Sequence, residues 1–304
     1  MNKSLLNSLN PVIKLILALV ITFLVFSIVF YTFLWIGTLI FNVSFTEFYT
    51  VTDTLDNIKI LKYLIAIQSL ALFLFPSLAI AWFFSSPIEF FHLNKRINVK
   101  NYLITILIVL AAQGVVSLLG YLNNNLHFPD SLFNIEQQLR NIEKKALLLI
   151  TSILSETNIY KLLLNIIIIA IIPAIGEELF FRGILQHYLN ETFNNAHVAI
   201  FSTALIFSFV HFEFFTFLPR FFLGLILGYI FYWNKNVLLP ILAHFTNNFI
   251  GIMIYYFGIQ NGKTPEELSL IEKPIIWLTL ISIVILSFLM YKLKQLSYAQ
   301  NKNS

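Results

Sequence analysis

Six polar residues stand within the apolar second half of the chain, and their types suit proton transfer and the stabilisation of negative charge. They form three sets: Glu177, Glu178 and Arg182 in GEELFFRG, His211 in FSFVH, and His244 with Asn248 in HFTNN. An ionisable side chain at the centre of a bilayer costs roughly 2.5–3.5 kcal/mol on insertion scales. The retention of several such residues indicates a buried polar site with a function.

The first set divides into two roles. Glu178 and Arg182 are four residues apart, so on a helix they share a face and form an ion pair. Pairing with a guanidinium keeps Glu178 charged and fixed, whereas Glu177 points about 100° away and has no cation near it in the sequence. We therefore expect Glu178 and Arg182 to support the site and Glu177 to accept a proton. The simpler alternative is a structural ion pair that only locks two helices together.

The histidine sets also follow helical spacing. Phe207 and His211 are four residues apart, as are His244 and Asn248. An imidazole suits proton transfer near neutral pH, and an imidazole beside a carboxamide can donate hydrogen bonds to an oxyanion. Taken singly, each set is also explained by ordinary hydrogen bonds between helices.

Together, the three sets could activate one water molecule. Glu177 would take a proton from the water, and His211 would hold the water or share that proton. His244 and Asn248 would stabilise the oxyanion that forms when hydroxide attacks a carbonyl carbon. This combination describes the hydrolysis of a peptide bond within a membrane.

The elements that carry these residues are predicted from composition. The chain has 304 residues, of which 58% are hydrophobic and 11% are charged, and this much apolar surface exceeds what one soluble core can bury. Apolar runs of about 17–25 residues are long enough to cross a bilayer core of about 30 Å. We predict an all-α, polytopic integral membrane protein with about eight spans. They lie near residues 12–41, 61–84, 101–122, 159–176, 197–212, 217–233, 237–258 and 274–292.

Two segments need separate interpretation. Residues 135–153 begin with charged residues and end with an apolar run, and we favour a surface helix over the start of a longer span. Pro173 lies one turn before the acidic pair, where it should kink the helix. We expect one integral membrane domain over residues 1–304, with a catalytic core at 159–258. Lysines near both ends predict cytoplasmic termini and a location in the cell membrane.

Composition also excludes several classes of function. The chain contains no cysteine, so it forms no disulfide and has no thiolate nucleophile or cysteine-ligated metal. The net charge of +4 suits a face near anionic lipid, and no basic stripe of the kind that nucleic acids require is present. We therefore expect the lipid bilayer and a membrane-bound peptide or protein as partners, and no nucleic acid.

The order EExxxR, FxxxH and HxxxN resembles the motifs of the CAAX prenyl endopeptidase family, also called CPBP intramembrane proteases. The resemblance covers about residues 159–258, and all three motifs are intact. It implies that Glu177 is the catalytic glutamate, that His211 helps to activate water, and that His244 and Asn248 stabilise the oxyanion. Glu178 and Arg182 match the remaining positions of the motif and are expected to support the site.

Metal dependence stays open in this family, which is described both as metalloprotease and as glutamate-dependent protease. Glu177, His211 and His244 would supply three protein ligands, the usual number in a catalytic zinc site. We favour a mechanism without metal, because asparagine is a poor zinc ligand and Glu177 is needed as the base. We therefore predict no cofactor.

Substrates implied by the resemblance are prenylated CAAX-type tails or leader peptides, and the sequence does not distinguish between them. An alternative is a membrane protein without catalytic activity that binds peptides, as in self-protection against bacteriocins. An ion-coupled transporter is a further alternative, because Glu, His and Arg in spans also form proton relays. Against the transporter, the polar residues crowd into one half of the chain and no matching broken helix is found in the other half.

Overall fold

The computed structural model describes residues 8–54, 57–155, 158–264, 267–268 and 273–302. Within these ranges the chain is helical and contains no strand, which agrees with the predicted all-α class. The first half contains α2 (Pro11–Phe41), α3 (Phe45–Thr54), α4 (Ile58–Ser69), η1 (Leu70–Leu74), α5 (Phe75–Phe84), α6 (Pro87–Phe90), α7 (Val99–Asn124), η2 (Asp130–Leu132) and α8 (Phe133–Leu154). The second half contains α9 (Ile159–Asn165), η3 (Ile166–Ile171), α10 (Ile172–Glu178), η4 (Leu179–Gln186), α11 (His187–Phe193), α12 (Ala196–Phe209), α13 (Phe217–Asn234), α14 (Leu238–Gln260) and α16 (Ile276–Lys302).

Length and composition identify the membrane-spanning helices. Among the described residues, six helices are long and apolar enough to cross a bilayer. They are Pro11–Phe41, Ile58–Phe84, Val99–Asn124, Ile159–Phe193, Leu238–Gln260 and Ile276–Gln300. The chain is therefore a polytopic α-helical membrane protein, and six of the eight expected spans meet these two criteria.

The other two expected spans, α12 and α13, differ for physical reasons. With 14 residues, α12 is about 21 Å long and too short to cross a hydrocarbon core of about 30 Å. Among its 18 residues, α13 includes Arg220 and Asn234, which lower its hydropathy. The fourth span, in contrast, continues beyond residue 176 to Phe193. It can continue because the charges of Glu178 and Arg182 neutralise each other inside the helix.

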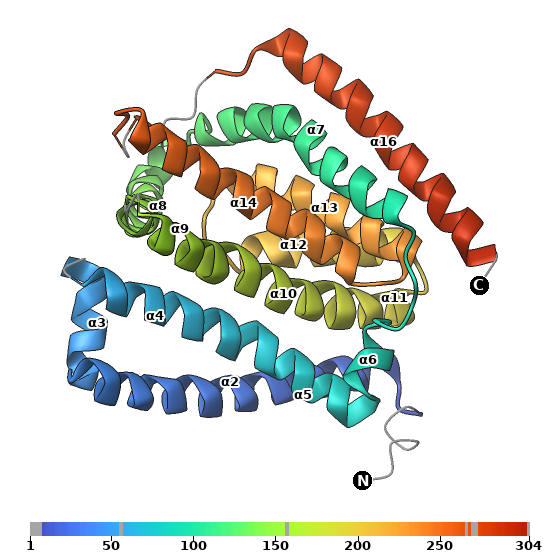
Figure 1. Cartoon of the computed structure of the whole chain (residues 1–304), viewed down its shortest axis with the longest axis horizontal. Coiled ribbons are helices and arrows are strands. Elements are labelled where there is room, and N and C mark those ends of the chain that lie inside the picture. The colour runs from blue at the N-terminus through green and yellow to red at the C-terminus, as the bar shows by residue number, and fades with distance from the viewer. Residues whose placement is uncertain (1–7, 55–56, 156–157, 265–266, 269–272, 303–304) are drawn as a thin grey trace.

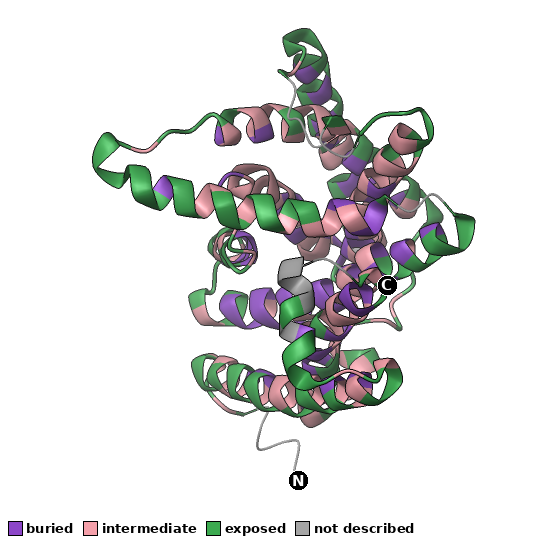
Figure 2. Cartoon of the chain, turned by 90° about the vertical axis from the view of Figure 1, so that its left-hand side faces the viewer, coloured by how far each residue is buried: buried purple, intermediate pink, exposed green. Residues whose placement is uncertain are grey.

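Figure 1 shows the long helices stacked across the molecule, with α2 and α4–α5 at one edge and α16 at the other. The continuous segment α9 to α11 and helix α14 lie between these edges and pack against each other through η3 and α10. Figure 2 shows buried residues concentrated in the middle of the stack. The outer helices expose large apolar side chains, including Phe23 at 69% and Val284 at 69%, as expected of surfaces that face lipid.

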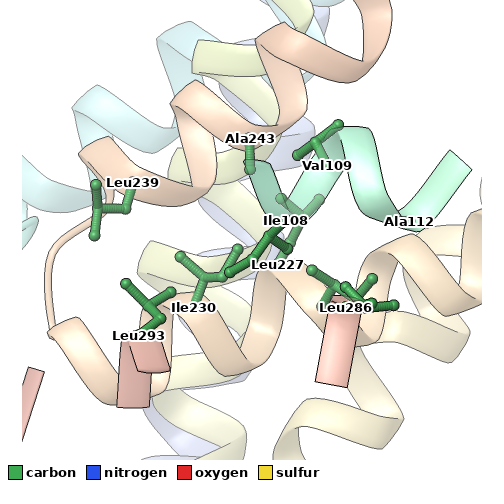
Figure 3. Close-up of a cluster of buried hydrophobic side chains, with 10 residues drawn as sticks. Ile108, Val109, Ala112, Leu227, Ile230, Leu239, Ala243, Leu286 and Leu293 are labelled. Carbon is green, nitrogen blue, oxygen red and sulfur yellow. The ribbon is translucent and has the colours of Figure 1, made fainter. Parts of the chain in front are cut away.

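A buried apolar cluster joins four helices next to the polar site. Ile108 of α7, Ile230 of α13, Leu239 of α14 and Leu293 of α16 are each 0% exposed and belong to this cluster. Figure 3 shows these side chains meeting from the four helices. The cluster fixes α13 relative to α14, and these two helices carry residues that line the candidate site.

Helices α12 and α13 approach each other closely at a glycine. A Cβ atom on Gly224 would lie 3.1 Å from Ala204 Cβ and 3.2 Å from Ala204 Cα. Only a residue without a side chain therefore allows the backbones to come this near. The close approach leaves the Gly224 carbonyl next to the fourth span, where a polar group can reach it.

The fourth span is irregular around the acidic pair. Two π-helical segments, η3 and η4, flank α10, and Pro173 lies in the first turn of α10 directly after η3. Proline lacks an N–H group, so the hydrogen-bond ladder has to be interrupted near Pro173. Single π-helical turns inside α-helices occur frequently at functional sites.

Helix α8 is separate from the fourth span. The side chain of Asn158 accepts a hydrogen bond from the Tyr160 N–H and caps the start of α9, so α8 does not continue into that span. The charged first half of α8 is largely exposed, and it is not among the helices apolar enough to cross the membrane. These features agree with the surface helix that we expected at residues 135–153.

Candidate active site

Glu178 connects two helices through one oxygen atom. Its Oε1 accepts a hydrogen bond from Arg182 Nη1 at 2.6 Å and lies 2.7 Å from His244 Nδ1. Glu178 and Arg182 are both 0% exposed. The i, i+4 ion pair expected from the sequence is therefore present, and Glu178 also contacts His244, which the sequence did not indicate.

Arg182 ties the fourth span to α12 and α13. Its Nη2 donates to the Gly224 carbonyl at 3.2 Å, and its guanidinium lies 4.8 Å from the centre of the Phe207 ring. A fully buried guanidinium needs a negative partner and acceptors for its N–H groups. Glu178 supplies the negative partner and Gly224 a further acceptor, while Nε has no partner among the described residues, and Arg182 thus connects three helices.

His211 lies just beyond the end of α12, in a turn, and not inside the span expected at 197–212. The helix ends at Phe209, and Phe212 takes a left-handed conformation with φ of 55°. The Nδ1–H of His211 donates to the Phe207 carbonyl at 2.7 Å and so satisfies one of the free carbonyls at the helix end. Because a carbonyl only accepts, neutral His211 carries its lone pair on Nε2.

Glu177 faces both imidazoles. Its Oε2 lies 4.0 Å from His211 Nε2 and 3.9 Å from His244 Nε2. Glu177 is 8% exposed, and its Oε2 has no hydrogen-bond partner among the described residues. The structure thus brings together a free carboxylate oxygen and two ring nitrogens from three separate elements, α10, the turn after α12, and α14.

Asn248 lies one turn after His244 on α14. Its Nδ2 donates to the Ile169 carbonyl at 3.3 Å, and its Oδ1 accepts from Asn247 Nδ2 at 3.4 Å. A carboxamide has two N–H groups, so one of them remains for a ligand. The Phe207 ring packs against both imidazoles, with its centre 5.1 Å from that of His211 and 6.0 Å from that of His244.

A cavity of about 810 Å³ is lined by the four residues expected to be catalytic, namely Glu177, His211, His244 and Asn248. Glu178 and Arg182 do not line it. Most of the wall is apolar and includes Phe73 of η1, Leu149 of α8 and Ile169 of η3.

Sequence reasoning missed two charged residues of this cavity. Arg220, in the first turn of α13, donates from Nη2 to Glu213 Oε2 at 2.6 Å, and both residues line the cavity. They lie in an otherwise apolar hairpin, which is a signal that could have identified them. Asn247 also lines the cavity and accepts a hydrogen bond from Gln113 at 3.3 Å.

Glu177, His211 and His244 are also the three ligands expected of a zinc site. Two imidazole nitrogens and a carboxylate oxygen are suitable zinc ligands by type. However, no group of three or more His, Cys, Asp or Glu side chains within the described ranges is arranged to hold a metal ion.

Comparisons with known proteins point to one family. The model of the family described as Type II CAAX prenyl endopeptidase Rce1-like matches residues 159–250. A curated relative, the uncharacterized protein YpbD of Bacillus subtilis (strain 168), is 26% identical over 114 residues. This alignment covers 36% of the chain and 56% of YpbD, so the chain spans little more than half of that relative. No solved structure matches the chain.

The matched residues contain the whole of the polar site described above, from Glu177 to Asn248. The six helices that are long and apolar enough to cross a bilayer make the chain an integral membrane protein. Residues 159–250 of the chain are therefore similar to the Rce1-like CAAX prenyl endopeptidase family.

Proposed function

We propose that this protein is an intramembrane endopeptidase that hydrolyses a peptide bond of a membrane-associated peptide with water activated by Glu177. The observation that carries the proposal is the position of Glu177 Oε2, which has no partner among the described residues and faces two imidazole Nε2 atoms at 3.9 and 4.0 Å. A carboxylate in this setting is suited to accept a proton.

One water molecule would fit between Glu177 and His211. Both atoms that face each other are acceptors, because the Nδ1–H of His211 is used by the Phe207 carbonyl. A bridging water would donate one O–H group to each acceptor and leave a lone pair for attack. The separation of 4.0 Å suits this bridge, since two hydrogen bonds of about 2.8 Å then enclose an angle of about 90°.

His244 and Asn248 would stabilise the developing negative charge. The carboxylate of Glu178 holds Nδ1–H of His244, and it also stabilises the imidazolium form, in which Nε2 becomes a donor. The free N–H group of Asn248 would be a second donor. Removing one such donor in known acyl-transfer sites costs about 2.7–4 kcal/mol of transition-state stabilisation.

Water, the peptide bond and Glu177 account for every bond and proton in the proposed reaction. The oxygen of the water forms a bond to the carbonyl carbon while a water proton moves to Glu177. The tetrahedral intermediate then collapses, the C–N bond breaks, and Glu177 returns the proton to the departing amine. Peptide and water become an acid and an amine, and the carboxylate of Glu177 is regenerated.

The apolar walls of the cavity are suited to bind an apolar substrate. Leu72, Phe73, Leu149 and Ile150 line it, and a peptide with a lipid-modified or apolar segment would bury its surface against them. We propose that the substrates are prenylated CAAX-type tails or leader peptides, processed in the cell membrane without a metal cofactor.

The test is cleavage of a mixed library of prenylated and unprenylated membrane peptides in proteoliposomes. Wild type should cleave one class of peptide, and Glu177→Gln, which keeps the side-chain shape, should cleave none while unfolding at a similar temperature. Glu191→Gln is the matched control, since Glu191 pairs with Lys14 and does not line the cavity. Its turnover should equal that of wild type. Each protein is assayed with and without a strong chelator.

Unchanged turnover in Glu177→Gln would refute the mechanism. Loss of wild-type turnover with the chelator, restored by zinc, would refute the metal-free form. If neither protein cleaves but both bind peptides, the protein is a peptide-binding membrane protein without catalytic activity.

A further inference from the structure

Arg220 lies in the cavity that contains Glu177 and His211, yet the proposed reaction does not use it. It is the only Lys or Arg among the described residues that line this cavity. A cation in a largely apolar wall is costly to retain unless it has a partner or a ligand. The hydrogen bonds of Arg220 show which N–H groups of its guanidinium already have an acceptor.

One end of the guanidinium is occupied and the other is not. Nη2 donates to Glu213 Oε2 at 2.6 Å and to Thr216 Oγ1 at 3.2 Å. Nη1 is buried and has no hydrogen-bond partner among the residues that the structure describes. A buried donor without an acceptor costs about 1–3 kcal/mol, and more when it is charged. A ligand that enters the cavity beside Arg220 would supply the missing acceptor.

The chemistry of the guanidinium selects the ligand. A guanidinium stays charged at any physiological pH and presents its N–H groups in a planar fork that matches a carboxylate. The proposed substrate is a peptide, and its carboxylates are the C-terminal group and the side chains of Asp and Glu. Both sources offer the same ligand chemistry to Nη1 of Arg220.

We propose that Arg220 is a specificity residue that binds a carboxylate of the peptide substrate. This inference rests on the proposed peptide substrate, but not on hydrolysis itself. Arg220 selects acidic peptides over neutral ones, while Glu177 and the histidines act at the scissile bond. The competing explanation is structural, because the ion pair with Glu213 also holds the turn that carries His211.

The experiment compares three forms of one fluorescent, leucine-rich membrane peptide, together with the best substrate of the library assay. One form has a free C-terminal carboxylate, one has a C-terminal carboxamide, and one combines the carboxamide with a Glu beside the apolar segment. Peptide binding is measured with the full-length Glu177→Gln protein in nanodiscs. The kcat/KM for cleavage is measured with the protein that retains Glu177.

The expected result is that one acidic form binds about tenfold to a hundredfold more tightly than the carboxamide, as a hydrogen bond between charged groups would give. Arg220→Gln should abolish this preference and leave the affinity for the carboxamide unchanged. Arg220→Lys should keep part of it, because the charge remains while the fork is lost. The acidic peptide that binds more tightly identifies whether the carboxylate is the C-terminal group or an acidic side chain.

The Glu213→Gln variant shows whether Arg220 determines substrate specificity or only holds the turn that carries His211. If Arg220 only holds the turn, Arg220→Gln and Glu213→Gln will lower kcat for all peptides by similar factors and leave the acid preference unchanged. If Arg220 binds the substrate, Glu213→Gln will retain the preference. Equal binding of acidic and neutral peptides by the protein with Arg220 intact would overturn the inference without any variant.

The two proposals fail in different ways. An acid preference that depends on Arg220, without cleavage by wild type, would support the carboxylate site and refute the protease. Cleavage by wild type without any acid preference would support the protease and refute the carboxylate site.

Discussion

Glu178 and His244 are 66 residues apart in the chain, yet Glu178 Oε1 lies 2.7 Å from His244 Nδ1. The same oxygen atom accepts the hydrogen bond from Arg182. Glu178 therefore neutralises a buried guanidinium and also orients an imidazole whose Nε2 faces Glu177 at 3.9 Å. The ion pair that was expected to brace one helix is part of the connection between two helices of the site.

Glu178→Gln should destabilise the protein and abolish its turnover. The variant leaves Arg182 charged and buried without a counter-charge, and breaking such a pair costs about 3–5 kcal/mol. It also removes the carboxylate oxygen that lies 2.7 Å from His244 Nδ1 and orients this imidazole. Thermal unfolding in detergent and cleavage of the library substrate measure the two effects.

The control is the double variant Glu178→Gln with Arg182→Met, which removes both charges. We expect it to regain part of the lost stability, because no unpaired charge remains, but not to regain turnover. Wild-type turnover in the double variant would mean that Glu178 serves the fold alone.

Asn248→Ala should lower kcat by about tenfold to a thousandfold, with KM little changed, because its amide is proposed to act in the transition state. Steady-state kinetics on the cleaved peptide measure both constants. Thr246→Ala is the matched control, since Thr246 Oγ1 donates to the Leu242 carbonyl within α14 and Thr246 does not line the cavity. Equal falls in kcat for the two variants would contradict the assignment of Asn248.

Gly224→Ala should lower the free energy of unfolding by about 1–3 kcal/mol, as overpacked sites do. The added methyl group would meet the backbone of Ala204, and the resulting shift would also move the carbonyl that binds Arg182. Unfolding in detergent and turnover measure these effects. Gly251→Ala, in the interior of α14 with nothing within 4 Å of a new Cβ, should instead stabilise the protein by up to about 1 kcal/mol. Equal effects at the two positions would exclude close packing as the cause.

The surface helix α8 should loosen at low pH. Hydrogen bonds from the Phe128 N–H and from Arg140 lower the pKa of Glu136 from 4.5 to about 2. Because the pKa of Glu136 is lower in the folded protein than in the unfolded chain, its ionised carboxylate stabilises the fold above pH 4.5. This stabilisation is lost as Glu136 becomes protonated between about pH 4.5 and pH 2. The difference in unfolding temperature between wild type and Glu136→Gln should shrink over this range. A difference that stays constant with pH would refute this role.

The sequence by itself determined the class of the protein and the local parts of its site. Apolar composition and apolar runs predicted a helical membrane protein, and the spacing of four residues predicted the pair of Glu178 and Arg182. These features follow from the length of a membrane-spanning helix and from the helical period of 3.6 residues, which act within one segment of the chain.

Only the tertiary structure decided which groups meet across helices. The contact of Glu178 with His244 and the position of Arg220 in the cavity depend on how α10, α13 and α14 pack. Of the two expected spans that do not meet the criteria for crossing a bilayer, α12 is too short, because hydropathy does not reveal where a helix ends. Helix α13 is more polar, because it includes Arg220 and Asn234. The turn after α12 places Nδ1 of His211 on the Phe207 carbonyl, and this contact determines which ring nitrogen faces Glu177.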